Sequence, residues 1–158
     1  MKVLFLDFDG VLNSERYVRS CGEYGVIIDP SRMLLLRQII DSTSAKIVLS
    51  TSWREHWDKD ESLCDGAGKQ INEIFKAYGL EIFDKTPKTG KDREKEIEEW
   101  LFSNPGVEAF AVLDDAFLCA DFLNEKFVRT SNWKNGLDEE GVEKAIGILN
   151  FPDRNEED

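Results

Sequence analysis

Short apolar segments that alternate with helical segments constrain the fold of this chain more than any other feature. Residues 3–8 (VLFLDF), 46–49 (KIVL) and 109–113 (AFAVL) have the near-continuous apolar composition of strands buried on both faces. Shorter strands are expected at 80–83 and 126–129. Periodicity and boundary residues predict helices at 29–42, 69–78, 92–103 and 137–149, with a short helix at 117–124. This order predicts an α/β sandwich of three layers around a central, mainly parallel five-stranded sheet.

Length and composition fit one such domain. The chain has 158 residues, of which 41% are hydrophobic, so residues 1–151 are expected to form a single domain with one core. Residues 152–158 (PDRNEED) carry a charge run that predicts a flexible acidic tail. The three cysteines are widely spaced and lack a C-x-x-C pattern, which argues against a disulfide framework or a zinc site.

The charge balance limits the partners that the chain can bind. Lys and Arg number 20 against 32 Asp and Glu, which gives a formal net charge of −12. Strong non-specific nucleic-acid binding is therefore not expected, although a local basic site is compatible with this charge. No apolar run reaches about 18 residues, so a membrane partner is not expected. Asp7 and Asp9 interrupt the apolar N-terminus, which favours a cytoplasmic protein over a secreted one. The oligomeric state is not predicted.

Acidic residues follow two of the apolar segments. Asp7 and Asp9 end the first segment, where a turn at Gly10 would expose both, and Asp114 and Asp115 follow residues 109–113 in the same way. If the two strands are neighbours, four carboxylates converge, and without a cation their repulsion raises their pKa values. Oxygen ligands of this kind favour Mg²⁺. The alternative is that each pair is only an acidic turn or cap.

Groups suited to anion binding lie in two other places. Ser50 and Thr51 follow the second predicted strand, and Arg54 could add charge-assisted hydrogen bonds to a phosphate. The alternative for the hydroxyls is a helix cap. Lys91 and Arg93 belong to the main cationic segment, just before a predicted helix, where a cation could neutralise a phosphate. The alternative for this segment is a solvated loop.

These motifs, in this order, resemble the haloacid dehalogenase (HAD) superfamily. The closer resemblance is to the small HAD-type domain associated with RNA-repair (Swiss Army Knife) proteins. The resemblance covers residues 2–150 and is carried by the segments FLDFDGVLN, VLSTSWREHW, REKEIEEWL, AVLDD and NGLDEEGVEKAIGIL. It implies a HAD-like Rossmannoid fold and a Mg²⁺-dependent phosphomonoesterase that acts through an aspartyl-phosphate. Asp9 favours a phosphate substrate, because dehalogenases of the superfamily lack this second acid. Val11 departs from the Thr that is common after the Gly.

The resemblance also implies the roles of the acidic residues. Asp7 would attack the phosphorus, and Asp9 would protonate the leaving oxygen and then activate water. Asp7 and Asp114 would bind Mg²⁺ through their side chains, and Asp9 would bind it through its backbone carbonyl. Asp115 would assist, directly or through water.

Ser50 and Lys91 complete the implied catalytic set. Ser50 would hydrogen-bond the phosphoryl oxygens, and Lys91 would stabilise the charge on Asp7 and the phosphoryl group. Arg93 is the alternative to Lys91, because it better matches the R-x-x-E-I-x-x-W-L stretch. Thr51, Arg54 and Arg93 are expected to contact the substrate.

The segments that could cover the site are short. Residues 12–29 have room for a flap or hairpin and residues 53–68 for one short helix, and neither can bury a core of its own. An essentially capless enzyme with an open site is expected, which suits a nucleotide or a nucleic-acid terminal phosphate. Trp53, His56 and Trp57 are candidates for lining the entrance, although packing is the favoured role. A non-catalytic binding or regulatory module with the same fold is the alternative function.

Overall fold

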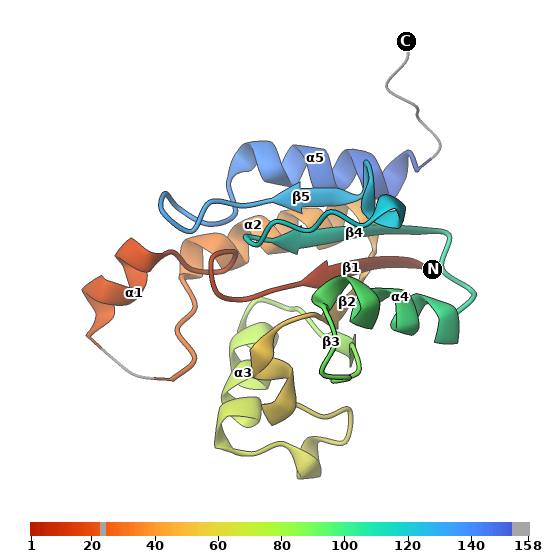
Figure 1. Ribbon diagram of the computed structural model, residues 1–158. Helices are drawn as coiled ribbons and strands as arrows, with labels where there is room; N and C mark the ends of the chain where they lie inside the picture. Colours follow the sequence, from red (N-terminus) through yellow and green to blue (C-terminus); the bar gives the residue numbers. More distant parts are fainter. Residues whose placement is uncertain (23–24, 153–158) are drawn as a thin grey trace.

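A parallel sheet forms the centre of the computed structural model, which describes residues 1–22 and 25–152. Residues 153–158 of the predicted tail lie outside the described residues. In the described part of the chain, five strands have the order β3-β2-β1-β4-β5, and every pairing among them is parallel (Figure 1). Their bounds are β1 Lys2–Leu6, β2 Lys46–Leu49, β3 Ile82–Lys85, β4 Ala109–Asp114 and β5 Phe127–Arg129. The predicted α/β, Rossmann-like architecture is confirmed.

Helices cover both faces of the sheet and give it a core on each side (Figure 1). Leu4 and Leu6 of β1 belong to the cluster on one face, whereas Val3 and Phe5 belong to the cluster on the other. This division follows from the alternation of side chains along a strand, and it explains why the strand is apolar throughout. The first cluster includes side chains of α2 (Pro30–Thr43), α3 (Gly66–Ala77) and α5 (Glu139–Asn150), and the second those of α4 (Arg93–Ser103) and η3 (Asp121–Leu123).

The helix boundaries follow from local capping chemistry. Asp29 precedes α2, and its Oδ1 accepts a hydrogen bond from the Ser31 N–H at 2.9 Å. Asp138 caps α5 in the same way through the Gly141 N–H at 2.8 Å. The strand predicted at 80–83 was placed two residues too early. Leu80 still belongs to the turn that ends α3, because its N–H donates to the Phe75 carbonyl at 2.9 Å.

The connections near the carboxyl ends of the strands differ in detail from those expected. The described residues of the 12–29 segment, where a flap or hairpin was expected, contain the helix α1 (Glu15–Cys21), whose residues are all at least partly exposed, and no strand pair. The Ser14 hydroxyl caps α1 by accepting from the Tyr17 N–H at 3.2 Å. The 53–68 segment contains two short 3₁₀ turns, η1 (Ser52–His56) and η2 (Glu61–Leu63), in place of one helix. The expected short helix at 117–124 is limited to η3.

Among the described residues, no helix combines the length and the apolar character that crossing a bilayer requires.

Candidate active site

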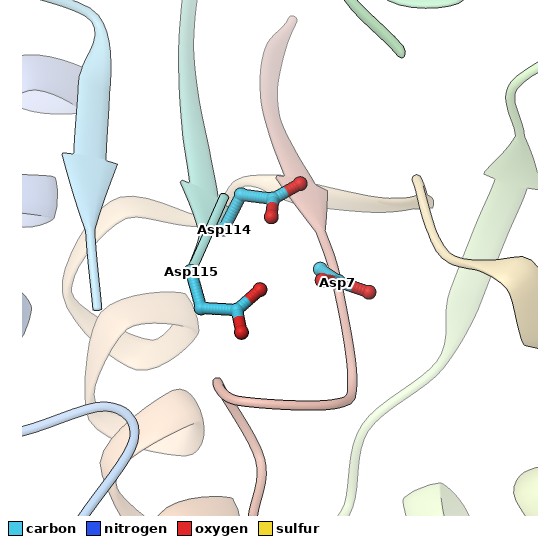
Figure 2. Close-up of side chains that lie close together, drawn as sticks. All are labelled: Asp7, Asp114 and Asp115. Carbon is cyan, nitrogen blue, oxygen red and sulfur yellow. The ribbon is translucent and has the colours of Figure 1, made fainter. Parts of the chain in front are cut away.

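Three carboxylates meet where β1 and β4 end (Figure 2). The two strands pair in parallel with Leu6 opposite Leu113, so that Asp7 and Asp114 emerge at the same level of the sheet. One carboxylate oxygen from each of Asp7, Asp114 and Asp115 lies within 4.8 Å of the others. Asp7 and Asp114 are buried, and Asp115 is half-buried. The predicted convergence of the two acidic motifs is therefore present for three of the four carboxylates.

The electrostatics of this acidic cluster call for a cation. Burial, and then the charge of Asp114, raise the pKa of Asp7 to about 8, although Arg93 and the Phe8 N–H oppose this shift. Burial and Asp114 also raise the pKa of Asp115. Three buried or half-buried anions at this separation are unfavourable unless positive charge compensates them. A set of three carboxylate oxygens is the donor type that Mg²⁺ prefers, so the residues present fit a magnesium ion.

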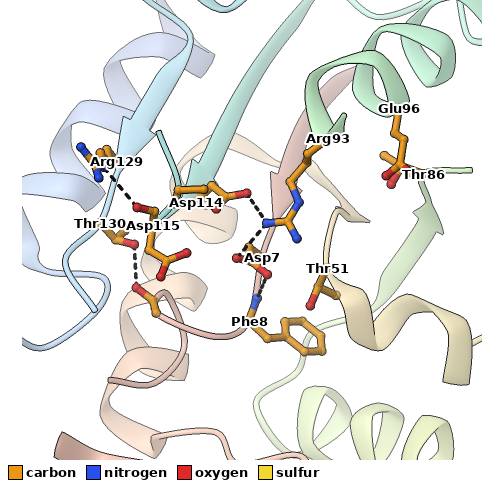
Figure 3. Close-up of polar contacts among 12 residues, drawn as sticks. Asp7, Phe8, Thr51, Thr86, Arg93, Glu96, Asp114, Asp115, Arg129 and Thr130 are labelled. Atoms are coloured by element: carbon orange, nitrogen blue, oxygen red, sulfur yellow. Dashed lines mark hydrogen bonds and ion pairs between the residues drawn. The ribbon is translucent and has the colours of Figure 1, made fainter. Parts of the chain in front are cut away.

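Arg93 supplies positive charge to this cluster from the first turn of α4 (Figure 3). Its Nη1 lies 3.1 Å from Asp7 Oδ2 and 2.7 Å from Asp114 Oδ2. Lys91, which the motif order favoured, lies elsewhere, and its Nζ is paired with Glu99 Oε1 at 3.1 Å on the exposed side of the helix. The structure thus corrects the favoured position of the cation from Lys91 to Arg93.

The helix period accounts for this correction. Arg93, Ile97 and Trp100 have the spacing of one helix face, and the last two are buried against the sheet. The face of α4 that packs on the sheet therefore carries Arg93 toward the strand ends. Lys91 precedes Asp92, the residue before the helix, and so does not share this face. The R-x-x-E-I-x-x-W-L pattern contained this signal.

Asp9 is not a member of the cluster formed by the other three carboxylates. Its Oδ1 accepts a hydrogen bond from Asn13 Nδ2 at 3.0 Å, and its Oδ2 accepts one from Trp53 Nε1 at 3.0 Å. The expectation of four converging carboxylates was wrong because β1 ends at Leu6, so the alternation of a strand does not extend to residue 9. Trp53 was expected chiefly to pack, and Asn13 was missed as a contact of Asp9.

The two hydroxyl residues that follow β2, Ser50 and Thr51, have different surroundings. Ser50 is 1% exposed, and its Oγ has no hydrogen-bond partner in the described part of the chain. Its backbone N–H donates to the Leu6 carbonyl at 2.9 Å, which fixes it beside the end of β1. A buried hydroxyl without a partner is costly unless a ligand satisfies it. Thr51 instead caps η1, where its Oγ1 accepts from the Trp53 N–H at 3.4 Å.

Arg54 is held by the protein itself. Its Nη2 forms a buried ion pair with Glu96 Oε2 at 2.8 Å, and its Nη1 donates to the Thr51 carbonyl at 2.8 Å. The other oxygen of Glu96 accepts from the Thr89 N–H at 3.2 Å. These contacts join the loop after β2 to α4 and to the loop before it. Arg54 is therefore a positioning residue that holds these loops together beside the acidic cluster.

A comparison with protein-family models identifies the chain. The model described as the HAD domain in Swiss Army Knife RNA repair proteins matches residues 3–142. The chain belongs to this family. The HAD prediction is therefore confirmed, and the family supports a phosphohydrolase-type function. No curated protein and no solved structure matches the chain.

Gly10 lets the two acidic loops of this HAD domain approach each other. Its φ of +82° is unfavourable for other residues, and a Cβ there would lie 2.3 Å from Asp115 Oδ2. Thr130 joins the same loops, because its Oγ1 donates to the Gly10 carbonyl at 2.6 Å (Figure 3). Its backbone N–H also donates to the Asp114 carbonyl at 2.9 Å. Thr130 was missed, although a polar residue directly after the fifth strand was an available signal.

Proposed function

We propose that this HAD domain is a Mg²⁺-dependent phosphomonoesterase in which Asp7 accepts the phosphoryl group and water then removes it. The observation that carries the proposal is the buried cluster of Asp7, Asp114 and Asp115, with Arg93 directed into it. Arg93 compensates the negative charge of this cluster only in part, so a divalent cation is needed to neutralise the rest. Arg93 and the cation together would then hold an anionic phosphoryl group. Residues 1–151 would act as one catalytic domain.

The first step transfers the phosphoryl group. A carboxylate oxygen of Asp7 forms a bond to phosphorus while the ester P–O bond breaks. The electron pair of that bond goes to the leaving oxygen, which takes a proton from Asp9. The product is an aspartyl-phosphate on Asp7, and Asp9 is now ionised. Asp9 must leave its contacts with Asn13 and Trp53, or share them, to reach the leaving group.

The second step restores Asp7. Ionised Asp9 accepts a proton from water as the water oxygen bonds to phosphorus and the bond between phosphorus and Asp7 breaks. Inorganic phosphate is released, and both carboxyl groups return to their starting states. The partnerless Ser50 hydroxyl would donate to a phosphoryl oxygen in both steps. Arg93 would neutralise the charge on Asp7 and on the phosphoryl group.

The metal ligands would be the side chains of Asp7, Asp114 and Asp115 and the backbone carbonyl of Asp9. When bound, Mg²⁺ would neutralise these carboxylates and the phosphoryl oxygens. The cluster supports this ligand set because its members lie together, buried or half-buried, and because burial and then the charge of Asp114 raise the pKa of Asp7. A cation beside Asp7 restores the carboxylate form that the first step requires.

We propose a nucleotide or a nucleic-acid terminal phosphate as the substrate, in the cytoplasm. The family description refers to RNA repair proteins, and short helices, not a separate domain, border the strand ends. The net charge of −12 argues that such a substrate is held at its end and not along its backbone. Arg54 and Thr51 are assigned a supporting role, since both Nη atoms of Arg54 and the Thr51 hydroxyl already bond to the protein, although the buried Arg54 Nε has no partner among the described residues.

Hydrolysis by the wild type and by Asp7→Asn tests the proposal. Each is incubated with p-nitrophenyl phosphate and with a 3′-phosphorylated oligonucleotide, once with Mg²⁺ and once with EDTA. The expected result is turnover that requires both Asp7 and the metal, with the oligonucleotide preferred. Circular dichroism confirms that the isosteric variant is folded. Turnover by folded Asp7→Asn contradicts the proposed role of Asp7, and absence of turnover with every substrate contradicts the proposed activity and favours a binding module.

A further inference from the structure

A groove of about 610 Å³ opens beside Arg93. One wall is the start of α4 with the loop before it, and the other is the loop at residues 116–118 that follows β4. Arg93 lines the groove and also contacts Asp7 and Asp114, so the groove begins where the acidic cluster ends. A phosphoester at Asp7 could therefore extend its organic part into the groove.

Phe117 gives this groove an apolar wall. Its side chain is 71% exposed, whereas its neighbour Leu118 is buried in the core beneath α4. The Arg129 guanidinium lies 5.6 Å from the centre of the Phe117 ring, and its Nε donates to the Asp115 carbonyl at 3.1 Å. The ring thus lies against a cation that bonds to the backbone of the acidic cluster, while most of its surface faces solvent.

The charges in the groove disfavour a second anion. Arg54 is already paired with Glu96 at 2.8 Å, and Lys91 with Glu99 at 3.1 Å. Asp92, which also lines the groove, adds further negative charge. The part of the ligand that fills the groove is therefore better neutral than charged. A neutral planar group would cover the exposed face of Phe117, whereas an aliphatic polyol would leave the ring hydrated.

We propose that Phe117 is a specificity-determining residue that stacks on the base of a nucleotide phosphoester whose phosphate lies at Asp7. The inference deepens the proposed function and rests on it. Stacking of a base on an aromatic side chain contributes about 1–3 kcal/mol, which is a factor of roughly 5–150 in affinity. The same ring suits a free mononucleotide and the last nucleotide of a strand, because both present one base next to the phosphate.

The test compares two phosphates of secondary alcohols, adenosine 3′-monophosphate and glycerol 2-phosphate. We expect Phe117→Ala to lower the ratio of kcat/KM between the nucleotide and glycerol 2-phosphate about tenfold, mainly through KM. Phe117→Trp should restore the ratio, because indole supplies another planar face. Phe102→Ala is the matched control, since Phe102 is 89% exposed at the other end of α4 and should leave the ratio unchanged.

The outcomes separate this inference from the proposed function. An active enzyme whose substrate ratio does not depend on Phe117, or in which Phe117→Ala lowers both activities equally, overturns the stacking role alone. If neither ester is hydrolysed, the dissociation constant of adenosine 3′-monophosphate is measured by calorimetry. Weaker binding to Phe117→Ala than to wild type supports stacking while the proposed chemistry fails, and equal binding overturns both. If kcat/KM for a 3′-phosphorylated trinucleotide falls by the same factor in Phe117→Ala, the site also accepts the last nucleotide of a strand and not only a free mononucleotide.

Discussion

Arg93 Nη1 lies 2.7 Å from Oδ2 of Asp114, a carboxylate with no solvent-exposed surface. The same nitrogen lies 3.1 Å from Asp7, so one guanidinium serves both strand ends. A buried carboxylate is tolerated only when charge or hydrogen bonds compensate it. Arg93 therefore ties the start of α4 to the centre of the site, and several predictions about the chemistry depend on this contact.

Replacement of Arg93 should affect turnover far more than replacement of Lys91. Arg93→Met is expected to lower kcat/KM about 100-fold, because it removes the cation that faces Asp7 and the phosphoryl group. Lys91→Met, which removes a cation from the exposed pair with Glu99, should change kcat/KM less than about twofold. Steady-state kinetics with p-nitrophenyl phosphate checks both values. A larger loss of kcat/KM in Lys91→Met than in Arg93→Met would mean that Lys91, and not Arg93, supplies the catalytic positive charge.

The indole of Trp53 should act through Asp9. Trp53→Phe removes the N–H that donates to Asp9 Oδ2, so proton transfer to the leaving oxygen becomes less well positioned. We expect kcat for an alkyl phosphate to fall about tenfold, with a smaller effect on p-nitrophenyl phosphate, whose leaving group needs little protonation. Trp57→Phe is the control, because the Trp57 indole donates to Asn72 and not to Asp9. Equal losses for both substrates would indicate a purely structural role.

The stability of the metal-free protein should fall as pH rises. The pKa of Asp7 is raised from 3.8 to about 8 in the folded state, so the folded protein binds a proton that the unfolded chain has lost. The resulting stabilisation is complete below about pH 4 and is lost as pH rises through about 8. In EDTA, Tm should decline between pH 5 and 8, and Asp7→Asn should reduce this decline.

Two comparisons at pH 8 complete this prediction. In EDTA at pH 8, the free energy of unfolding of Asp7→Asn should exceed that of wild type by about 1 kcal/mol, which corresponds to a Tm about 2–4 °C higher. The reason is that the amide carries no charge to repel Asp114. Mg²⁺ should raise the Tm of wild type more than that of Asp7→Asn. Thermal unfolding followed by circular dichroism measures both differences. A Tm that rises with pH in EDTA, or an equal effect of Mg²⁺ on the two proteins, would argue against a strained acidic cluster.

A side chain at residue 10 should disrupt the site and not only the backbone. Gly10→Ala adds a Cβ 2.3 Å from Asp115 Oδ2 at a φ of +82°, and is expected to cost about 3 kcal/mol and to weaken Mg²⁺ binding. Gly79→Ala is the matched control, because Gly79 has a φ of +70° with nothing within 4 Å, so it should cost about 1 kcal/mol. Urea unfolding and metal titration give the two readouts. Equal costs would mean that only backbone strain is involved.

The sequence was sufficient for the features that depend on whole strands. Apolar runs predicted parallel strands, and the carboxyl ends of parallel strands face one edge of a sheet. The sequence predicted that Asp7, Asp9, Asp114 and Asp115 converge if the two strands are neighbours, and the structure supplies the pairing of β1 with β4 and brings three of the four together. The family model, which matches residues 3–142, spans all three of these residues.

The features that were missed depend on turns and loops. The position of the Asp9 side chain depends on where β1 ends. Side chains alternate between the two faces only within a strand, so the alternation could not be extended past Leu6 to residue 9. The contacts of Trp53 and Thr130 join segments far apart in the chain, for which no local pattern exists, whereas Asn13 reaches Asp9 from only four residues away and was still missed. Arg93 was accessible in principle, because its helix period with Ile97 was written in the sequence.

The most direct test of the account is the detection of a phosphorylated Asp7. Asp9→Asn with Mg²⁺ and p-nitrophenyl phosphate is quenched in acid and analysed by mass spectrometry of peptides. The good leaving group allows the first step, and the missing base slows the second, so the account predicts a phosphoryl adduct on the peptide that contains Asp7. Asp7→Asn should lack it. Release of inorganic phosphate by wild type, with no adduct in Asp9→Asn and with turnover retained by Asp7→Asn, would contradict the central claim.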